Sequence, residues 1–178
     1  MKNNLVKKLT TLSLFLALGV VISYFESFIP YPLPVPGVRL GLANIIGLYV
    51  LYIYSPKEYL FVGLLRVLIV GALRANAINL AISSAGFVLS HLTVVGLYYL
   101  KKMSIYGLGV SSAVMHSVGQ ILVVMIIYQL PQMINYLPLI FFTSIASSLV
   151  ISLITSILIS RTKFLFEDRG EINEKETD

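Results

Sequence analysis

The 178-residue sequence contains no cysteine and few charged residues. The absence of cysteine excludes disulfides, thiolate metal sites and cysteine nucleophiles. Asp, Glu, Lys and Arg together make up 12% of the chain, whereas a soluble domain carries about 25%. Apolar residues take their place, because 57% of the chain is hydrophobic and its mean hydropathy is +0.89. This composition predicts an integral membrane protein.

Six apolar segments are candidates for membrane-spanning helices, because a span needs about 20 apolar residues. They cover residues 6–28, 39–54, 58–74, 77–100, 105–129 and 137–160. The second and third are short, which leaves them tilted, partly re-entrant or packed inside the bundle. An open sheet cannot satisfy its backbone polar groups in lipid. The expected fold is therefore an all-α bundle of six transmembrane helices over residues 1–160.

The net charge of +5 reflects topology rather than a nucleic-acid partner, because the basic residues lie at the ends of the apolar segments. With the N-terminus in the cytoplasm, only Arg39 and Arg74 fall at the outer face, and Arg66 lies within the third segment. Ten others fall inside: Lys2, Lys7, Lys8, Lys57, Lys101, Lys102, Arg161, Lys163, Arg169 and Lys175. The positive-inside rule thus predicts that both termini are cytoplasmic.

Both ends of the chain carry expectations of their own. The first segment is too long for a secretory signal and lacks a small-x-small cleavage site, so we expect it to be retained. Residues 161–178 form a charged cytoplasmic tail, expected to be disordered after its first turn.

Polar residues inside the apolar segments follow helical spacing. In the fourth segment they step by three or four and share one face; they are Asn76, Asn79, Ser83, Gly86 and Ser90. In the fifth, Ser112, His116 and Gln120 step by four. Small and hydroxyl residues also let helices approach one another. The pattern therefore leaves both helix packing and a lined cavity open.

The stretch "PYPLPVPGVRLGLANIIGL" at residues 30–48 adds an arginine and an asparagine at the start of an apolar helix. A buried charge is costly in the membrane and normally faces a partner or a wet cavity. Arg39, with the positive N-terminus of this helix, favours an anion. In a closed bundle the outer half would collect a set with excess positive charge: Glu26, Arg39, Asn44, Arg74, Asn76 and Asn79, with Arg66 beneath. This set predicts a pocket for an anionic ligand, unless Glu26 and an arginine only lock the bundle.

The segment "PGVRLGLANIIGL" resembles the signature of the bacterial heptaprenyl diphosphate synthase component I family, also called the Gx transporter family. "AISSAGFVLS" at 81–90 and "GVSSAVMHSVGQ" at 109–120 agree with it, and the likeness covers roughly residues 9–160. Against the family pattern, Ser112 stands where glycine is usual, and Ser117 where asparagine follows the histidine. The family is similar to the substrate-binding S components of energy-coupling-factor (ECF) importers.

That resemblance implies six helices in a bacterial cytoplasmic membrane, with a ligand pocket in the outer half. It also implies that small residues of the first helix, Ser13 and Ala17, contact a transmembrane coupling subunit. No G-x-x-x-x-G-K-[ST] motif is present, so partner ATPases would have to hydrolyse ATP. No metal or other cofactor is expected in this chain.

Three functions remain open from the sequence. The first, which we favour, is a non-enzymatic subunit that captures a small anionic metabolite for import. The second is a membrane component of a prenyl diphosphate synthase, bound to a soluble synthase subunit. Such synthases hold magnesium with aspartate-rich motifs, whereas the two aspartates here, Asp168 and Asp178, lie in the tail, so only an accessory role fits. The third is a structural or channel-like bundle, which polarity confined to the outer half disfavours.

Overall fold

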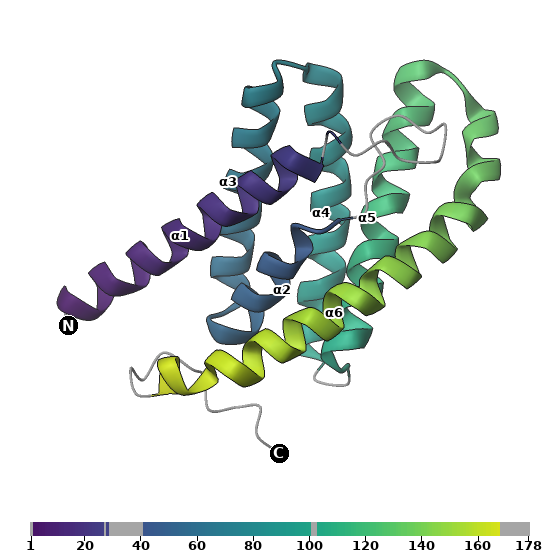
Figure 1. The fold of residues 1–178 in the computed structure, drawn as a ribbon. Helices are drawn as coiled ribbons and strands as arrows, with labels where there is room; N and C mark the ends of the chain where they lie inside the picture. The colour runs from purple at the N-terminus through teal and green to yellow at the C-terminus, as the bar shows by residue number, and fades with distance from the viewer. Residues whose placement is uncertain (1, 27, 29–40, 101–102, 168–178) are drawn as a thin grey trace.

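The computed structural model describes residues 2–26, 28, 41–100 and 103–167. Over these residues the chain is helical and contains no strand. Figure 1 shows the elements in chain order: α1 (Lys2–Glu26), α2 (Asn44–Ile53), α3 (Pro56–Arg74), α4 (Ala77–Tyr99), α5 (Ile105–Tyr128), the 3-10 helix η1 (Pro131–Tyr136) and α6 (Leu137–Glu167). The all-α prediction is confirmed.

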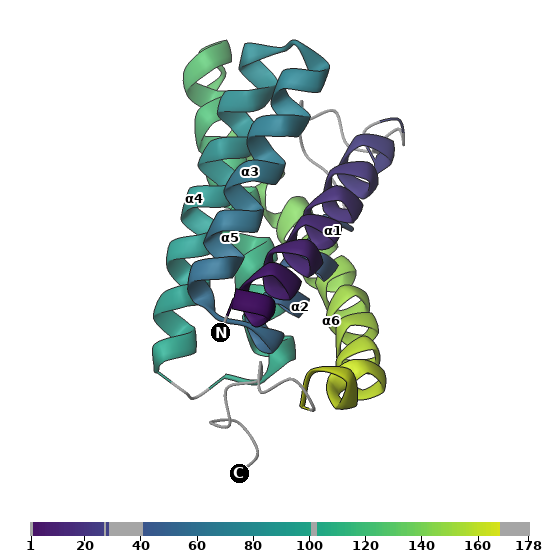
Figure 2. The same ribbon diagram turned by 90° about the vertical axis from the view of Figure 1, so that its left-hand side faces the viewer.

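The helices form two layers. Figure 2 shows α3, α4 and α5 side by side, with α1, α2 and α6 against one side of them. The contacts agree, because α4 packs on α3 and α5, while α2 touches α1, α3 and α6. The start of α1, the α2–α3 corner and the last turn of α4 lie toward the lower end in Figure 1, and the α3–α4 turn lies at the upper end. The basic residues predict that the lower end faces the cytoplasm, and this orientation stays a prediction.

Local sequence explains where the helices begin and end. Ser55 caps α3 by accepting a hydrogen bond from the backbone N–H of Lys57, and proline occupies the first turn. The helix ends at Ala75, whose φ of 47° is left-handed. Asn76 then caps α4, its side-chain oxygen accepting from Asn79 N–H at 3.0 Å. The α3–α4 hairpin is therefore tight and needs only two linking residues.

The short helix α2 is packed inside the protein, one of the arrangements that its length left open. Ten residues span about 15 Å, half of the hydrocarbon core. Its Val50 and Leu51 are fully buried. Tyr49 and Val50 join a core cluster with Leu12 of α1 and Val62 of α3, and the opposite side of α2 joins α4, α5 and α6. This helix is the centre of the core.

Within the described residues, four helical stretches are long and apolar enough to cross a membrane, so the expected six spans are not confirmed. They are Leu5–Glu26, Ala77–Tyr99, Ile105–Tyr128 and Pro131–Thr162. Helix α3 falls short because it contains four charged residues, Lys57, Glu58, Arg66 and Arg74. Helix α6 continues past the expected boundary at residue 160 to Glu167. The remainder of the predicted tail, residues 168–178, lies outside the described part.

Candidate functional site

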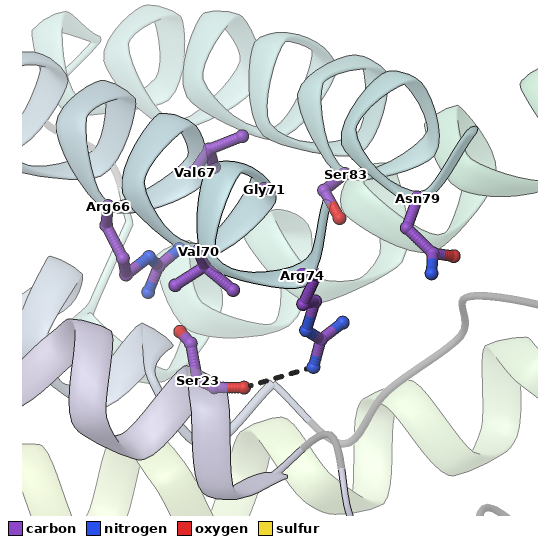
Figure 3. A pocket seen from close by; sticks show the side chains of 8 residues that line it. All are labelled: Ser23, Arg66, Val67, Val70, Gly71, Arg74, Asn79 and Ser83. Carbon is purple, nitrogen blue, oxygen red and sulfur yellow. Dashed lines mark hydrogen bonds between the residues drawn. The ribbon is translucent and has the colours of Figure 1, made fainter. Parts of the chain in front are cut away.

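A cavity of about 50 Å³ lies between α1, α3 and α4. Figure 3 shows the side chains that line it, which come from the last turns of α1, the outer half of α3 and the start of α4. They are Ser23, Arg66, Val67, Val70, Gly71, Arg74, Asn79 and Ser83. Four of the residues predicted for the pocket are thus brought together: Arg66, Arg74, Asn79 and Ser83.

Both cationic residues of the cavity come from one face of α3. Arg66 and Arg74 are eight residues apart, which is about 12 Å along a helix, and Val70 lies midway between them on the same face. In Figure 3 the two guanidinium groups extend toward α1, with Ser23 facing them. Val70 therefore forms an apolar part of the cavity lining between two cationic side chains that extend toward α1.

Arg74 is held loosely. Its Nη2 donates to the backbone oxygen of Ser23 over 3.5 Å, a long hydrogen bond. Its Nε is buried and has no hydrogen-bond partner among the residues that the structure describes. A buried donor without a partner is destabilising, so an added acceptor in the cavity would be favourable.

Arg66 passes between two helices before it reaches the cavity. A side chain on Gly19 would lie 3.3 Å from Arg66 Cδ, and Ile46 of α2 is on the same side. Glycine at position 19 therefore leaves room for the stem of the arginine. Among the described residues, neither Arg66 nor Arg74 has a carboxylate within 4.0 Å, the one such ion pair being Lys8–Glu58.

Both arginines interact electrostatically with the carboxylate of Glu26, the last residue of α1. Its side chain is buried and accepts a hydrogen bond from Gly41 N–H at 2.5 Å, with Leu42 and Ala43 also donating from the backbone. Gly41 adopts a φ of +80° that suits glycine. The amides at the start of α2, which the sequence suggested for an anionic ligand, are thus taken by Glu26. The negative charge of this carboxylate also favours the charged form of both arginines.

A second, smaller cavity of about 10 Å³ lies on the other side of Arg66. Asn44 of α2 and Tyr59 of α3 line it together with Ser112 of α5. Ser112 and Ser90 lie close enough to the Tyr59 hydroxyl to stabilise it electrostatically, and the two serine Oγ atoms are 2.8 Å apart. Sequence reasoning did not assign Tyr59 to the site, because a tyrosine at the inner end of an apolar helix looks like core.

Residues 15–158 match the family described as heptaprenyl diphosphate synthase component I. The chain belongs to this family. The match covers every residue of both cavities, and the resemblance seen in the sequence is confirmed. No curated protein and no solved structure matches the chain.

In this component I protein the polar stripe of α4 divides into two parts. Asn79 and Ser83 line the cavity, whereas Gly86 and Ser90 face α5. A Cβ at Gly86 would lie 2.8 Å from the His116 carbonyl oxygen and 2.9 Å from Gln120 Cγ. The inner half of the stripe therefore serves close helix packing, which was one of the two readings left open.

The remaining predicted residues lie apart from the cavity. Gln120 is buried at the α4–α5 contact, and His116 bonds to the backbone of Gly86. Asn76 caps α4, as described above. Arg39 falls outside the described residues. Ser13 and Ala17 are exposed on the face of α1 that points away from the protein. For all of them a role in ligand or partner binding stays a prediction.

Sequence reasoning also missed Ser23 and Gly19. Together with Glu26 they step by four and three along α1 and so share one face. That spacing of small and acidic residues, read with the arginines of α3, could have identified the wall of the cavity.

Proposed function

We propose that this component I protein is a membrane subunit that binds a small anionic metabolite in the cavity between α1, α3 and α4. The observation that carries the proposal is the pair Arg66 and Arg74, which line one cavity without a carboxylate within 4.0 Å among the described residues. A charge near the middle of a membrane helix costs about 2.5–3.5 kcal/mol on insertion scales. An anion in the cavity would offset that cost.

The cavity must open to take a metabolite. Its volume of about 50 Å³ is far below the roughly 300–1,000 Å³ of ligand pockets. Its α1 side is the weakest wall, because Ser23 reaches Arg74 through a 3.5 Å hydrogen bond and Gly19 presents no side chain to Arg66. Ligand entry therefore involves a movement of α1 away from α3.

The role that suits such a site is substrate capture for an ECF-type importer in the cytoplasmic membrane of a bacterium. The chain would supply the binding site, and a transmembrane coupling subunit and ATPases would supply the energy. In support, Ser13 and Ala17 are small and exposed on the surface of α1 that points away from the other helices. Small residues at such positions allow another helix to approach closely. The wall that must move and the face that would meet the partner then belong to the same helix.

A second candidate is favoured by the family description itself. That description names a component of heptaprenyl diphosphate synthase, and the chain would then be the non-catalytic membrane component beside a soluble synthase subunit. Arg66 and Arg74 suit a diphosphate as well as a carboxylate. The described residues contain no group of three His, Asp or Glu side chains that could hold a metal, so the soluble subunit would carry out catalysis.

The partner distinguishes the two candidates. The protein is purified gently from its native membrane after chemical cross-linking, and its stoichiometric partners are identified by mass spectrometry. Recovery of a membrane coupling subunit with ATPases supports the importer. Recovery of a soluble prenyl synthase subunit, without ATPases, replaces it with the second candidate. Native mass spectrometry of the same sample weighs any bound metabolite.

A further inference from the structure

We infer that Glu26 is a resident anion that the ligand displaces, and that its displacement releases α1 from α2. The inference rests on the proposed anion cavity and adds a regulatory step to it. It accounts for a feature that the proposed function leaves aside, namely a buried carboxylate beside a site meant for anions.

Glu26 affects the anion cavity through its charge. Glu26 is 6% exposed and acts on both Arg66 and Arg74 without forming an ion pair within 4.0 Å. Its negative charge therefore partly compensates the arginines while their hydrogen-bonding groups stay available. An anion that enters the cavity meets this like charge, which weakens its binding.

Glu26 also helps to hold the outer end of α1 in place. Among the described residues, Ser23 and Glu26 in the last turns of α1 make polar contacts with the neighbouring helices. Ser23 accepts from Arg74 of α3, and Glu26 accepts from Gly41 at the start of α2. A ligand that binds Arg74 competes for the first contact, and its charge repels the carboxylate that makes the second. Ligand binding therefore weakens both of these contacts at the outer end of α1.

The inner end of α1 is held by a separate contact. Lys8 Nζ bonds to Glu58 Oε1 at 2.5 Å, and Ser55 bonds to the other oxygen of Glu58. This contact lies at the far end of α1 from the cavity. Loss of Glu26 should therefore let the outer end of α1 swing while its inner end stays attached to α3.

The test compares Glu26→Gln with wild type in phosphatidylcholine nanodiscs, with inorganic pyrophosphate as the probe at constant ionic strength. Glutamine keeps the size and an acceptor oxygen but removes the charge. We expect pyrophosphate to bind about tenfold more tightly to Glu26→Gln, because a like charge beside the site is gone. Glu58→Gln is the matched control, since it removes an α3 carboxylate that contacts Lys8 near the inner end of α1, far from the cavity, and should leave the affinity unchanged. Glu26→Asp keeps the charge and should show no gain.

The movement of α1 is measured on the same variants. Since the chain has no cysteine, spin labels can be placed at Val21→Cys and Ile126→Cys, both exposed positions, without background. The distance distribution should broaden or shift in Glu26→Gln without any anion, and in wild type on addition of pyrophosphate.

The outcomes separate this inference from the proposed function. Unchanged or weaker binding by Glu26→Gln, or an equal gain in Glu26→Asp, overturns Glu26 as a competitor. An unchanged distance distribution in Glu26→Gln overturns the release of α1, whether or not pyrophosphate binds. If Arg74→Gln and Arg66→Leu bind pyrophosphate as wild type does, the anion cavity itself is wrong.

Discussion

At the scale of single residues, the two arginines of α3 differ in what surrounds them. Arg74 lies in the last turn of α3 and touches the backbone of Ser23. Arg66 lies deeper, threads past Gly19 and borders both cavities. We therefore expect replacement of either arginine to lower anion affinity while the fold is retained.

For Arg74→Gln we expect anion affinity to fall on the order of tenfold to a hundredfold, because a charge-assisted hydrogen bond is worth about 1.5–3 kcal/mol. Folding should survive, since one 3.5 Å bond is lost. For Arg66→Leu we expect affinity to fall while the melting temperature holds or rises, because a poorly paired charge leaves the membrane interior. Titration calorimetry and thermal melts followed by circular dichroism check both. Unchanged affinity in both variants would leave the arginines as structural residues.

At the scale of helices, the contact between α4 and α5 is set by small residues. A Cβ at Gly86 would meet the His116 carbonyl oxygen at 2.8 Å, and one at Gly119 would meet the Ala85 carbonyl oxygen at 2.7 Å. Real Cβ atoms do not approach backbone atoms this closely. The two glycines let the helix backbones pack against each other, and this holds α4 in place as the wall behind Ser83.

Gly86→Ala should therefore destabilise the protein by about 1–3 kcal/mol through overpacking. Gly96→Ala is the control within the same helix, because a Cβ there has no atom within 4 Å. We expect this change to be neutral or to stabilise by about 0.5–1 kcal/mol, as alanine favours helix. Equal melting temperatures for the two variants would show that α4 and α5 can separate without loss.

Helix α1 is also the element through which a partner would be engaged. Replacing the exposed Ala17 by tryptophan should weaken assembly with the coupling subunit several-fold, because a bulky residue keeps helices apart. Anion affinity should not change, as Ala17 faces away from the cavity. Leu14→Trp is a control, since Leu14 already presents a large exposed side chain. Co-purification with the partner is the measurement, and equal recovery for all three proteins would remove Ala17 from the interface.

At the scale of the whole molecule, the distribution of lysines and arginines predicts which parts face the cytoplasm. We expect reporter fusions at Lys57, Lys102 and the C-terminus to report cytoplasm, and fusions near Pro34 and Gln132 to report the exterior. The structure agrees in placing the α2–α3 corner and the α3–α4 turn at opposite ends (Figure 1). A cytoplasmic signal at Pro34 would invert the molecule and put the cavity on the inner side.

The family, the helical class and the extent of most helices could be read from the sequence alone. The apolar runs and the caps Ser55 and Asn76 are local features, so the start of α3 and of α4 lies within two residues of its predicted place. The membrane class likewise follows from the low content of charged residues and the high mean hydropathy, which depend on composition alone. The polar stripes and the arginines marked α3 and α4 as the helices that carry the site.

Only the tertiary structure decided which polar residues meet. Helical spacing gives the face of a residue but not the neighbour of that face, so the stripe of α4 could not be divided at Gly86 from the sequence. The same limit hid Ser23, which enters the cavity only because α1 crosses α3 at that point. It also hid the position of α2. The apolar sequence of this helix is compatible with several arrangements, and its contacts with α1, α3 and α6 decide between them. Glu26 could be predicted near the arginines, but its bonds to the start of α2 depend on how the chain returns to Gly41.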